Sequence, residues 1–180
     1  MTGSDPSPRL GSDPGRVATW LVAGWLVAGC APSEVAWQPV EPPVEAPDFS
    51  LAALDGGDVR LSELRGRVVV MEFWATWCGP CRYSSPSLEV MYRKYRDRGV
   101  TILLVNQAES PEEIRTWAEG RFTAPMLLDA QQAVARQYRV TGLPTLFIID
   151  QQGMIRYHEA GYGGGLERAL QRIFEELLAA

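Results

Sequence analysis

Two cysteines, Cys78 and Cys81, lie between a continuous apolar run and an amphipathic segment, and this arrangement restricts the fold more than any other feature. The run Val68–Trp74 is typical of a buried strand, and residues 81–98 repeat apolar side chains at helical spacing. A strand that passes directly into a helix places Cys78 at the helix N-terminus and Cys81 one turn along, close enough for a disulfide. The unpaired N–H groups of that helix end stabilise a thiolate, so we predict that Cys78 is the nucleophile.

The rest of residues 48–180 alternates between strand-like and helix-like patterns. Ser110, Pro111 and Glu113 have the spacing of a capping box with proline in the first helical turn. The other predicted elements are a hairpin from Phe49–Leu54 and Val59–Leu61, a strand over Val100–Asn106, a helix from Asp129 and Gln132 to about Tyr138, a hairpin from Thr145–Asp150 and Ile155–Glu159, and a helix over Leu166–Leu178. We therefore expect an α/β domain with a mixed central sheet flanked by helices and an N-terminal β-hairpin extension.

The composition excludes several classes of protein. The 180 residues are 46% hydrophobic and 22% charged, with 17 basic against 22 acidic side chains and a net charge of -5. Such a chain is neither disordered nor a basic nucleic-acid binder, so we expect no nucleic-acid partner. A domain of about 150 residues buries roughly 70% of the surface of its unfolded chain, so its core needs no disulfide framework. The cysteines therefore require another explanation.

Residues 1–29 have the features of a secretory signal peptide. Val17–Gly29 contains no charged side chain, follows two arginines and ends at Cys30. A membrane span needs about 20 apolar residues, whereas a signal peptide needs about 7–15. The end of the run, Val27–Cys30, resembles the lipobox of bacterial lipoproteins, in which the cysteine is lipidated. We therefore predict that Cys30 is a membrane anchor. The alternative is a buried helix with a chance cysteine.

Residues 30–47 are predicted to be a proline-rich tether between Cys30 and the domain. Five prolines occur in Ala31–Pro47, which has no helical or strand period. Proline-rich chain extends by about 3.1 Å per residue, so this tether would hold the domain at most about 50 Å from a membrane. The alternative is a strand lying along the domain at Val35–Trp37.

Glu72 is an acidic residue inside the apolar run Val68–Trp74. Alternation places its side chain on the same face as two valines, where burial disfavours the charged form and raises the pKa of the carboxyl. An acid six residues before Cys78 is a candidate proton acceptor for Cys81. The alternative is a glutamate at a strand edge that reaches solvent.

These motifs resemble those of thioredoxins, and nearly all of residues 47–178 is similar to the TlpA/ResA-like group of membrane-anchored, extracytoplasmic thiol-disulfide oxidoreductases. The matching segments are Ala46–Leu51, Glu72–Cys81, Val105–Asn106 and Val140–Thr145. A bare cysteine pair at this spacing is a weak signal, whereas the pair with these flanking segments is strong. The resemblance implies a thioredoxin fold. Many relatives in the group carry an acid three residues after the second cysteine, where this chain has Ser84.

The resemblance also implies an activity. The Gly-Pro dipeptide between the cysteines is similar to that of reducing thioredoxins, which implies a reductase of exported cysteine-containing proteins such as apocytochrome c. A membrane thiol donor would supply its electrons, and the Cys78–Cys81 disulfide would be its only redox group, with no other cofactor. We expect a monomer that faces an extracytoplasmic space, on the periplasmic side of the membrane in a Gram-negative cell.

The resemblance further implies a cis peptide bond before Pro144, although local sequence alone favours a trans bond. In thioredoxin-like proteins this proline packs against the active-site sulfurs. The backbone of Leu143 would then bind an extended substrate segment by strand addition. The substrate-binding residues are expected to be Trp77, Gly79, Pro80, Leu143 and Pro144.

Other interpretations are compatible with the same residues. A structural zinc half-site needs a second ligand pair, and His158 is the single histidine, so no metal site is predicted. Copper delivery would use the same thiols, because thiolates suit Cu(I). Pro47–Phe49 resembles a peroxiredoxin segment, which leaves a peroxidase as an alternative, and a redox-inert binding module is another. Trp74 belongs either to the rim of the site or to the core, and His158 faces either solvent or the core.

Overall fold

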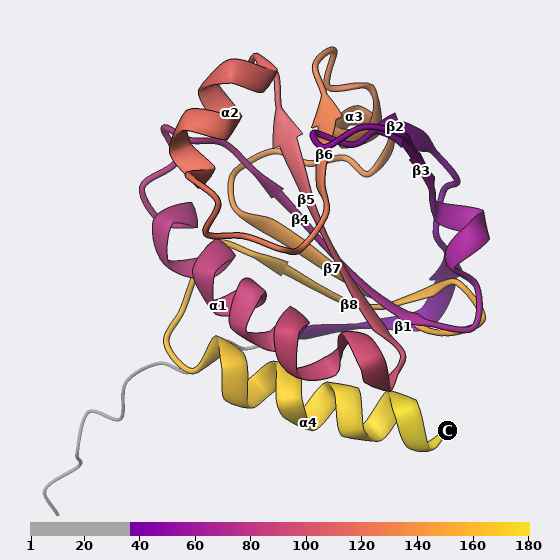
Figure 1. Cartoon of the computed structure of the whole chain (residues 1–180). Coiled ribbons are helices and arrows are strands. Elements are labelled where there is room, and N and C mark those ends of the chain that lie inside the picture. The colour runs from indigo at the N-terminus through magenta and orange to yellow at the C-terminus, as the bar shows by residue number, and fades with distance from the viewer. Residues whose placement is uncertain (1–36) are drawn as a thin grey trace, which may run out of the picture. The chain divides into compact units, whose positions relative to one another are not determined.

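The computed structural model describes residues 37–180, in which six strands form a central sheet in the order β1-β8-β7-β4-β5-β6 (Figure 1). The strands are β1 Gln38–Glu45, β4 Val68–Trp74, β5 Val100–Gln107, β6 Met126–Asp129, β7 Thr145–Ile149 and β8 Met154–Ala160. β4, β5 and β6 run parallel, β7 is antiparallel to β4, and β8 is antiparallel to both β7 and β1. The mixed central sheet expected from the sequence is therefore confirmed.

In the described part of the chain, the remaining elements are four helices, two short 3₁₀ turns and a separate hairpin. They are α1 Cys81–Tyr95, α2 Pro111–Ala118, α3 Ala133–Gln137, α4 Leu166–Ala179, η1 Leu61–Leu64, η2 Arg96–Arg98, and the antiparallel pair β2 Ser50–Ala52 and β3 Asp58–Arg60. The predicted capping box is present, because the Ser110 hydroxyl accepts from the Glu113 N–H and the Glu113 carboxylate accepts from the Ser110 N–H. The N-terminal hairpin extension is also confirmed.

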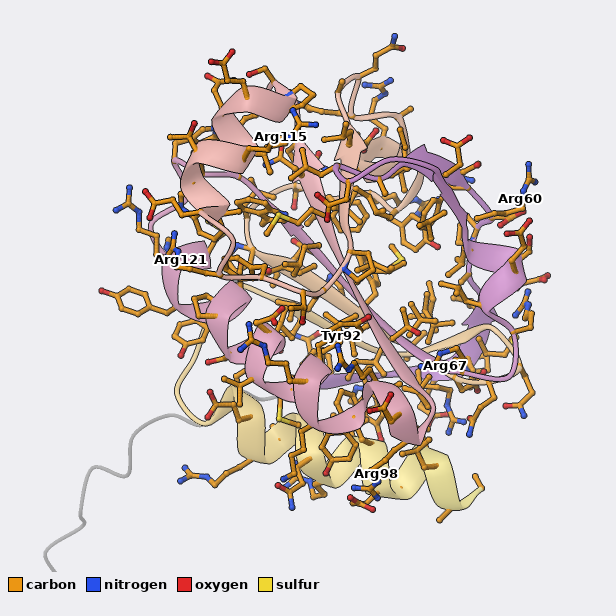
Figure 2. The ribbon with its side chains drawn as sticks, in the orientation of Figure 1. Arg60, Arg67, Tyr92, Arg98, Arg115 and Arg121 are labelled. Carbon is orange, nitrogen blue, oxygen red and sulfur yellow. A yellow bond between two sulfur atoms is a disulfide. The ribbon has the colours of Figure 1, made fainter. Side chains whose placement is uncertain are left out.

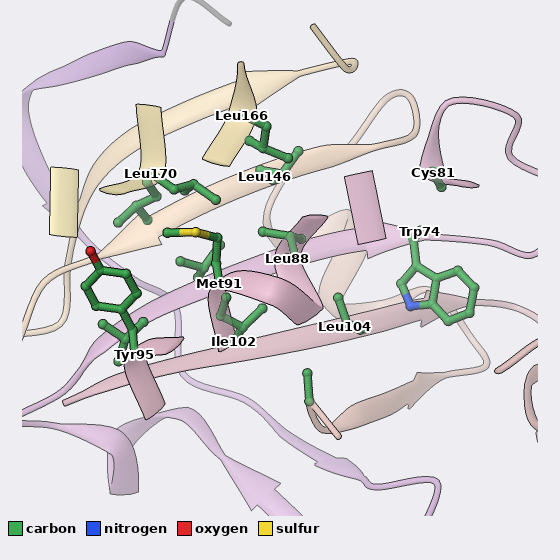
Figure 3. Close-up of a cluster of buried hydrophobic side chains, with 14 of the residues drawn as sticks. Trp74, Cys81, Leu88, Met91, Tyr95, Ile102, Leu104, Leu146, Leu166 and Leu170 are labelled. Carbon is green, nitrogen blue, oxygen red and sulfur yellow. The ribbon is translucent and has the colours of Figure 1, made fainter. Parts of the chain in front are cut away.

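Helices α1 and α4 lie side by side over one face of the sheet (Figure 1). Their apolar side chains meet those of the central strands, and Figure 3 shows Leu88, Leu104 and Leu146 in this cluster, with Cys81 and Trp74 at one end. Beyond the C-terminal end of α1, Arg98 of η2, which is labelled in Figure 2, forms an ion pair with Glu175 of α4 at 2.9 Å. The core therefore fixes the helix that begins at Cys81 against the sheet.

The other face of the sheet is covered by α3 and by the chain around the small hairpin. Aromatic rings connect these parts, because Tyr138 packs against Phe49, Phe73 and Phe147 at centroid distances of 6.3, 5.8 and 5.2 Å. The Tyr138 hydroxyl donates to the Pro47 carbonyl at 2.8 Å. The segment before the hairpin is thus part of the folded domain.

The prediction of a tether over residues 30–47 is wrong for its second half. Gln38–Glu45 forms the edge strand β1, which pairs with β8 in a register that joins Gln38 to His158 and Val44 to Ile155, with a shift of register between Pro39 and Val44. Proline cannot donate to a sheet, so a proline-rich strand is tolerated at an edge, where only one side of the strand is paired. This strand was not predicted because its prolines interrupt the alternating pattern of apolar and polar residues by which strands are recognised.

Two further elements differ from the sequence-based expectation. Strand β6 was not predicted, since its few residues give too short a pattern. Helix α3 is short and starts after Gln132, which has a left-handed backbone and provides no side-chain cap. The Asp129 carboxylate instead accepts from the N–H groups of Val134 and Ala135, at 3.3 and 2.8 Å. The acid predicted to begin this helix therefore does cap it, from the end of β6.

The predicted signal peptide over residues 1–29 and the predicted lipid anchor at Cys30 lie outside the described residues. Within residues 37–180, no helix combines the length and the apolar character that crossing a membrane requires.

Candidate active site

Cys78 and Cys81 form a disulfide at the point where β4 passes into α1. The backbone N–H of Cys81, at the start of the helix, donates to Cys78 Sγ at 3.2 Å. Cys78 is 4% exposed and Cys81 is 0% exposed. Since Cys78 and not Cys81 lines the surface hollow beside the disulfide and a helix N–H points at its sulfur, the geometry suits Cys78 as the attacking thiolate and Cys81 as the resolving thiol.

The loop before Cys78 is held by Glu109, a residue that the sequence analysis did not single out. Its carboxylate accepts from the Thr76 N–H and from the Asn106 side-chain amide, both at 2.7 Å, and also from the Thr76 hydroxyl. Glu109 follows the end of β5, which is parallel to β4. Because parallel neighbouring strands end at the same edge of a sheet, an acid placed there was the available signal for this contact.

Glu72 is fully buried in the centre of β4. The hydroxyl of Ser85 donates to its carboxylate at 2.6 Å, and the hydroxyl of Ser84 donates to the other oxygen. Burial raises the pKa of Glu72 to about 7, and the two serine hydrogen bonds keep the pKa from rising further. The predicted burial and pKa direction are therefore confirmed, and the alternative of a solvent-reaching glutamate is wrong.

The neighbours of Glu72 across the sheet are apolar. Its register partners are Leu104 on β5 and Leu146 on β7, both buried. Leu146 in turn pairs with Glu159 on β8, whose pKa is raised by burial. Ser84 and Ser85 stand one turn after Cys81 on α1, so the polar group that connects Glu72 to the active-site helix is the serine pair.

The Leu143–Pro144 peptide bond is cis, as predicted. The loop is held on both sides of Leu143, because the Thr145 hydroxyl donates to the Gly142 carbonyl and the Gly161 N–H donates to the Pro144 carbonyl, each at 2.7 Å. Within residues 37–180 the Leu143 N–H donates to no acceptor. The backbone of Leu143 is therefore available to an extended peptide.

A hollow of about 470 Å³ brings Cys78 and Leu143 together on one surface. The lining residues are Trp77, Cys78, Gly79, Pro80, Gln107, Gln132, Ala135, Arg136, Val140, Thr141, Gly142 and Leu143. Four of the five predicted substrate-binding residues line it, and the fifth, Pro144, is buried and does not line it. Trp77 is 69% exposed and also borders a second hollow, on the side of α2. Sequence reasoning missed Gln107 and Arg136, because only the fold brings them to Cys78.

Two residues with open interpretations are now placed. Trp74 is fully buried and packs against Trp117 at 4.5 Å between ring centroids, so it belongs to the core. His158 packs against Phe147 at 4.9 Å, and burial lowers its pKa. Phe147 belongs to the sheet face opposite the one on which Cys81 packs. In the described part of the chain, no group of three or more His, Cys, Asp or Glu side chains could hold a metal ion.

Known proteins are similar to this chain in both sequence and fold. Thiol-disulfide oxidoreductase ResA of Geobacillus kaustophilus strain HTA426 is 42% identical over 113 residues, which are 62% of this chain and 64% of that protein. The chain thus spans less than two thirds of the length of this curated relative. A Chlorobium tepidum structure assigned as the thiol:disulfide interchange protein DsbE covers 79% of this chain and 99% of that chain, with 30% identity and a TM-score of 0.71.

A third relative is the exposed lipoprotein thioredoxin Etrx1 of Streptococcus pneumoniae strain TIGR4. It is 28% identical, with a TM-score of 0.64, over 73% of this chain and 100% of that chain. These structures confirm the expected thioredoxin-like fold. The AhpC/TSA family matches residues 43–158, which is more than half of the chain, and this protein therefore belongs to the AhpC/TSA family, with ResA-like thiol-disulfide oxidoreductases among its relatives.

Proposed function

We propose that this protein is a thiol-disulfide oxidoreductase that reduces disulfides in exported proteins. The observation that carries the proposal is the Cys78–Cys81 disulfide at the N-terminus of α1, with the Cys81 N–H directed at Cys78 Sγ. A relative that is 42% identical is named for thiol-disulfide oxidoreductase activity. The disulfide is the redox group, and the proposed reaction uses no other cofactor.

Substrate binding is assigned to the surface beside Cys78. Trp77, Gly79 and Pro80 form one side of it, and Leu143 forms the other. The free N–H of Leu143 would pair with the substrate backbone in the manner of strand addition, with Pro144 fixing the direction of this loop. The substrate cysteine would then lie over Cys78 Sγ.

The reaction is a two-electron exchange of sulfur bonds. The Cys78 thiolate attacks one sulfur of the substrate disulfide, which forms a mixed disulfide and releases the other substrate sulfur as a thiolate that takes up a proton. The Cys81 thiolate then attacks Cys78 Sγ and releases the second substrate sulfur. The substrate has gained two electrons and two protons, and the Cys78–Cys81 disulfide has formed.

Glu72 is the proposed proton acceptor for Cys81. Cys81 is fully buried, so its thiol cannot lose its proton directly to bulk water. A carboxyl with a pKa of about 7 can accept and return a proton near neutral pH, and Ser84 and Ser85 connect it to the helix that begins at Cys81.

The cellular setting is also proposed. Cys30 would carry the lipid that anchors the protein on the extracytoplasmic side of a membrane. In support, the pneumococcal relative is named an exposed lipoprotein. A membrane thiol donor would reduce the disulfide again, and apocytochrome c is one candidate substrate. The protein would act as a monomer. Fractionation of cells that express Cys30→Ser tests the anchor, because that variant should leave the membrane fraction.

The decisive experiment measures the equilibrium reduction potential of the Cys78–Cys81 pair. A value near the roughly -270 mV of thioredoxin is expected for a reductase, whereas a value near the roughly -120 mV of DsbA would make the protein a disulfide donor and contradict the proposal. Turnover of a protein disulfide should be lost in Cys78→Ser. In Cys81→Ser the substrate should remain attached to Cys78 as a mixed disulfide.

A further inference from the structure

The hollow beside Cys78 has a wall that the proposed disulfide exchange does not use. This wall consists of Gln107 at the end of β5, Gln132 just before α3, Arg136 within α3, and Val140. The hollow has a volume of about 470 Å³, which lies within the roughly 300–1,000 Å³ of small-ligand sites. It therefore has room for a side chain next to the cysteine that reacts with Cys78.

The charge of this wall is positive. Arg136 is the only charged residue among those that line the hollow, and its side chain is exposed. Its guanidinium donates to the Gln131 carbonyl at 2.7 Å, and no carboxylate pairs with it within residues 37–180. Since a guanidinium has five N–H donors in a planar fork, most of its donors are free for a ligand.

A second polar group at the wall is also a donor. Gln107 is 6% exposed, and its buried Nε2 donates to no acceptor in the part of the chain that the structure describes. A buried donor without a partner costs free energy, which a ligand with an acceptor group would recover. Gln107 Nε2, which has no partner, and the remaining N–H groups of Arg136 therefore both favour an acceptor, and Arg136 adds a positive charge.

The second hollow that Trp77 borders differs in charge. Arg82 contributes one positive charge there, and Glu112 and Glu113 contribute two negative charges. An acidic side chain would be repelled on that side of Trp77 and attracted on the side of Arg136. The charges of the two hollows therefore determine on which side of Trp77 an acidic substrate side chain binds.

We infer that the hollow lined by Gln107 and Arg136 binds a carboxylate side chain next to the substrate cysteine, so that the preferred substrates carry aspartate or glutamate beside the reacting cysteine. This inference rests on the proposed function and specifies its substrate class. The same chemistry could come from a free chain terminus, so the experiment uses both sources.

The experiment compares disulfide-linked peptides Ac-Gly-Xaa-Cys-Xaa-Gly-NH2 with Xaa as Asp or Asn. Each rate of reduction is divided by the rate with dithiothreitol at the same pH, which removes differences in intrinsic thiol reactivity. A partly exposed ion pair contributes up to about 1 kcal/mol, so we expect the Asp peptide to react about threefold to fivefold faster. The preference should shrink in 1 M salt, where screening is strong.

Matched variants assign the preference to a residue. Arg136→Gln should abolish the preference for Asp over Asn, whereas Arg82→Gln removes an arginine from the other hollow and should retain it. Equal rates for the two peptides, or a preference that survives in Arg136→Gln, would overturn the inference. A gain only with an Asn peptide that ends in a free cysteine carboxylate would also overturn it, in favour of a chain terminus.

Binding without electron transfer separates this inference from the proposed function. The S-methylated Asp and Asn peptides are titrated into the oxidised protein, and the Asp peptide should bind threefold to fivefold more tightly. If neither disulfide peptide is reduced but the S-methylated Asp peptide still binds more tightly, the proposed function fails and the carboxylate site stands. Equal binding of the two S-methylated peptides contradicts the carboxylate site alone.

Discussion

Glu72 and Glu109 support the same pair of cysteines from two different surroundings. Glu72 lies fully buried in the middle of β4 and accepts only from the hydroxyls of Ser84 and Ser85. Glu109 is half-buried after the end of β5 and accepts from a backbone N–H and a side-chain amide, as well as from the Thr76 hydroxyl. One carboxylate is connected to the helix after the cysteines and the other to the loop before them.

The chemistry of the donors explains the difference. A serine hydroxyl can rotate and either donate to a carboxylate or accept from a protonated carboxyl, so the surroundings of Glu72 suit both protonation states. The Thr76 N–H can only donate, and Asn106 directs its side-chain NH2 group at the carboxylate, so Glu109 presents acceptor oxygens to both. We therefore assign proton exchange to Glu72 and positioning of the loop to Glu109.

The largest expected effect that tests this assignment is on the resolving step. In Glu72→Gln, release of a chromophoric thiol from a mixed disulfide at Cys78 should slow by about 100-fold at pH 7, because Cys81 loses its proton acceptor. The inflection near pH 7 that Glu72 contributes should also disappear. Stopped-flow absorbance between pH 5 and 9 measures both changes.

Glu109→Gln is the matched control for that measurement. Its amide oxygen can accept from the Thr76 N–H and Asn106, and its NH2 can donate to the Thr76 hydroxyl, so the contacts survive while the charge is lost. The rate should change by less than about threefold, because exposed or half-exposed charges act weakly, and the inflection should stay. Equal losses in the two variants would contradict the division of roles.

The second largest effect is on stability and follows from linkage. The Glu72 carboxyl has an ordinary pKa of 4.5 in the unfolded chain and a pKa of about 7 in the folded protein. Between these pH values the folded protein holds the extra proton, so the free energy of unfolding falls as the pH rises from about 4.5 to 7 and then stays level. The expected fall is about 3 kcal/mol.

Denaturant unfolding of the oxidised protein at several pH values measures this fall. Glu72→Gln cannot ionise, so this contribution to the pH dependence should be missing from its unfolding free energy over the same range. Glu109→Gln should retain it. The same pH dependence in the wild-type protein and in Glu72→Gln over this range would show that Glu72 is ionised in the folded protein and would contradict the prediction.

Sequence reasoning was most successful where local patterns determine structure. The strand Val68–Trp74 has the predicted bounds, and the disulfide occurs where the spacing of Cys78 and Cys81 predicted one. The burial of Glu72 was also predicted, because alternation places its side chain on the same face of the strand as two valines. Both faces of this central strand are covered in the structure. Each of these conclusions needed only the residues of one short segment.

The parts that sequence reasoning missed depend on contacts between distant segments. Glu109 meets Thr76 only because β4 and β5 end at the same edge of the sheet. Arg136 approaches Cys78 only because α3 lies beside the loop before Pro144. The residue pattern of one segment does not identify the segment that it meets, so these contacts follow only from the order of the strands and the position of α3. The cis bond before Pro144 was predicted from the family resemblance and not from local chemistry.

The smallest predicted effect concerns Ser84, whose hydroxyl donates to the Glu72 carboxylate on β4. In Ser84→Ala the Glu72 carboxylate loses one hydroxyl donor, so its charged form is stabilised less and its pKa rises further. A hydrogen bond to a charged group contributes about 1.5 kcal/mol, which corresponds to about one pH unit. The inflection in the thiol-release profile should therefore move upward by about one unit.

Ser87→Ala, the same change on the same helix at a residue that does not contact Glu72, should leave the inflection in place. An inflection that moves downward in Ser84→Ala, or equally in both variants, would mean that the serine hydroxyl does not set the proton affinity of Glu72.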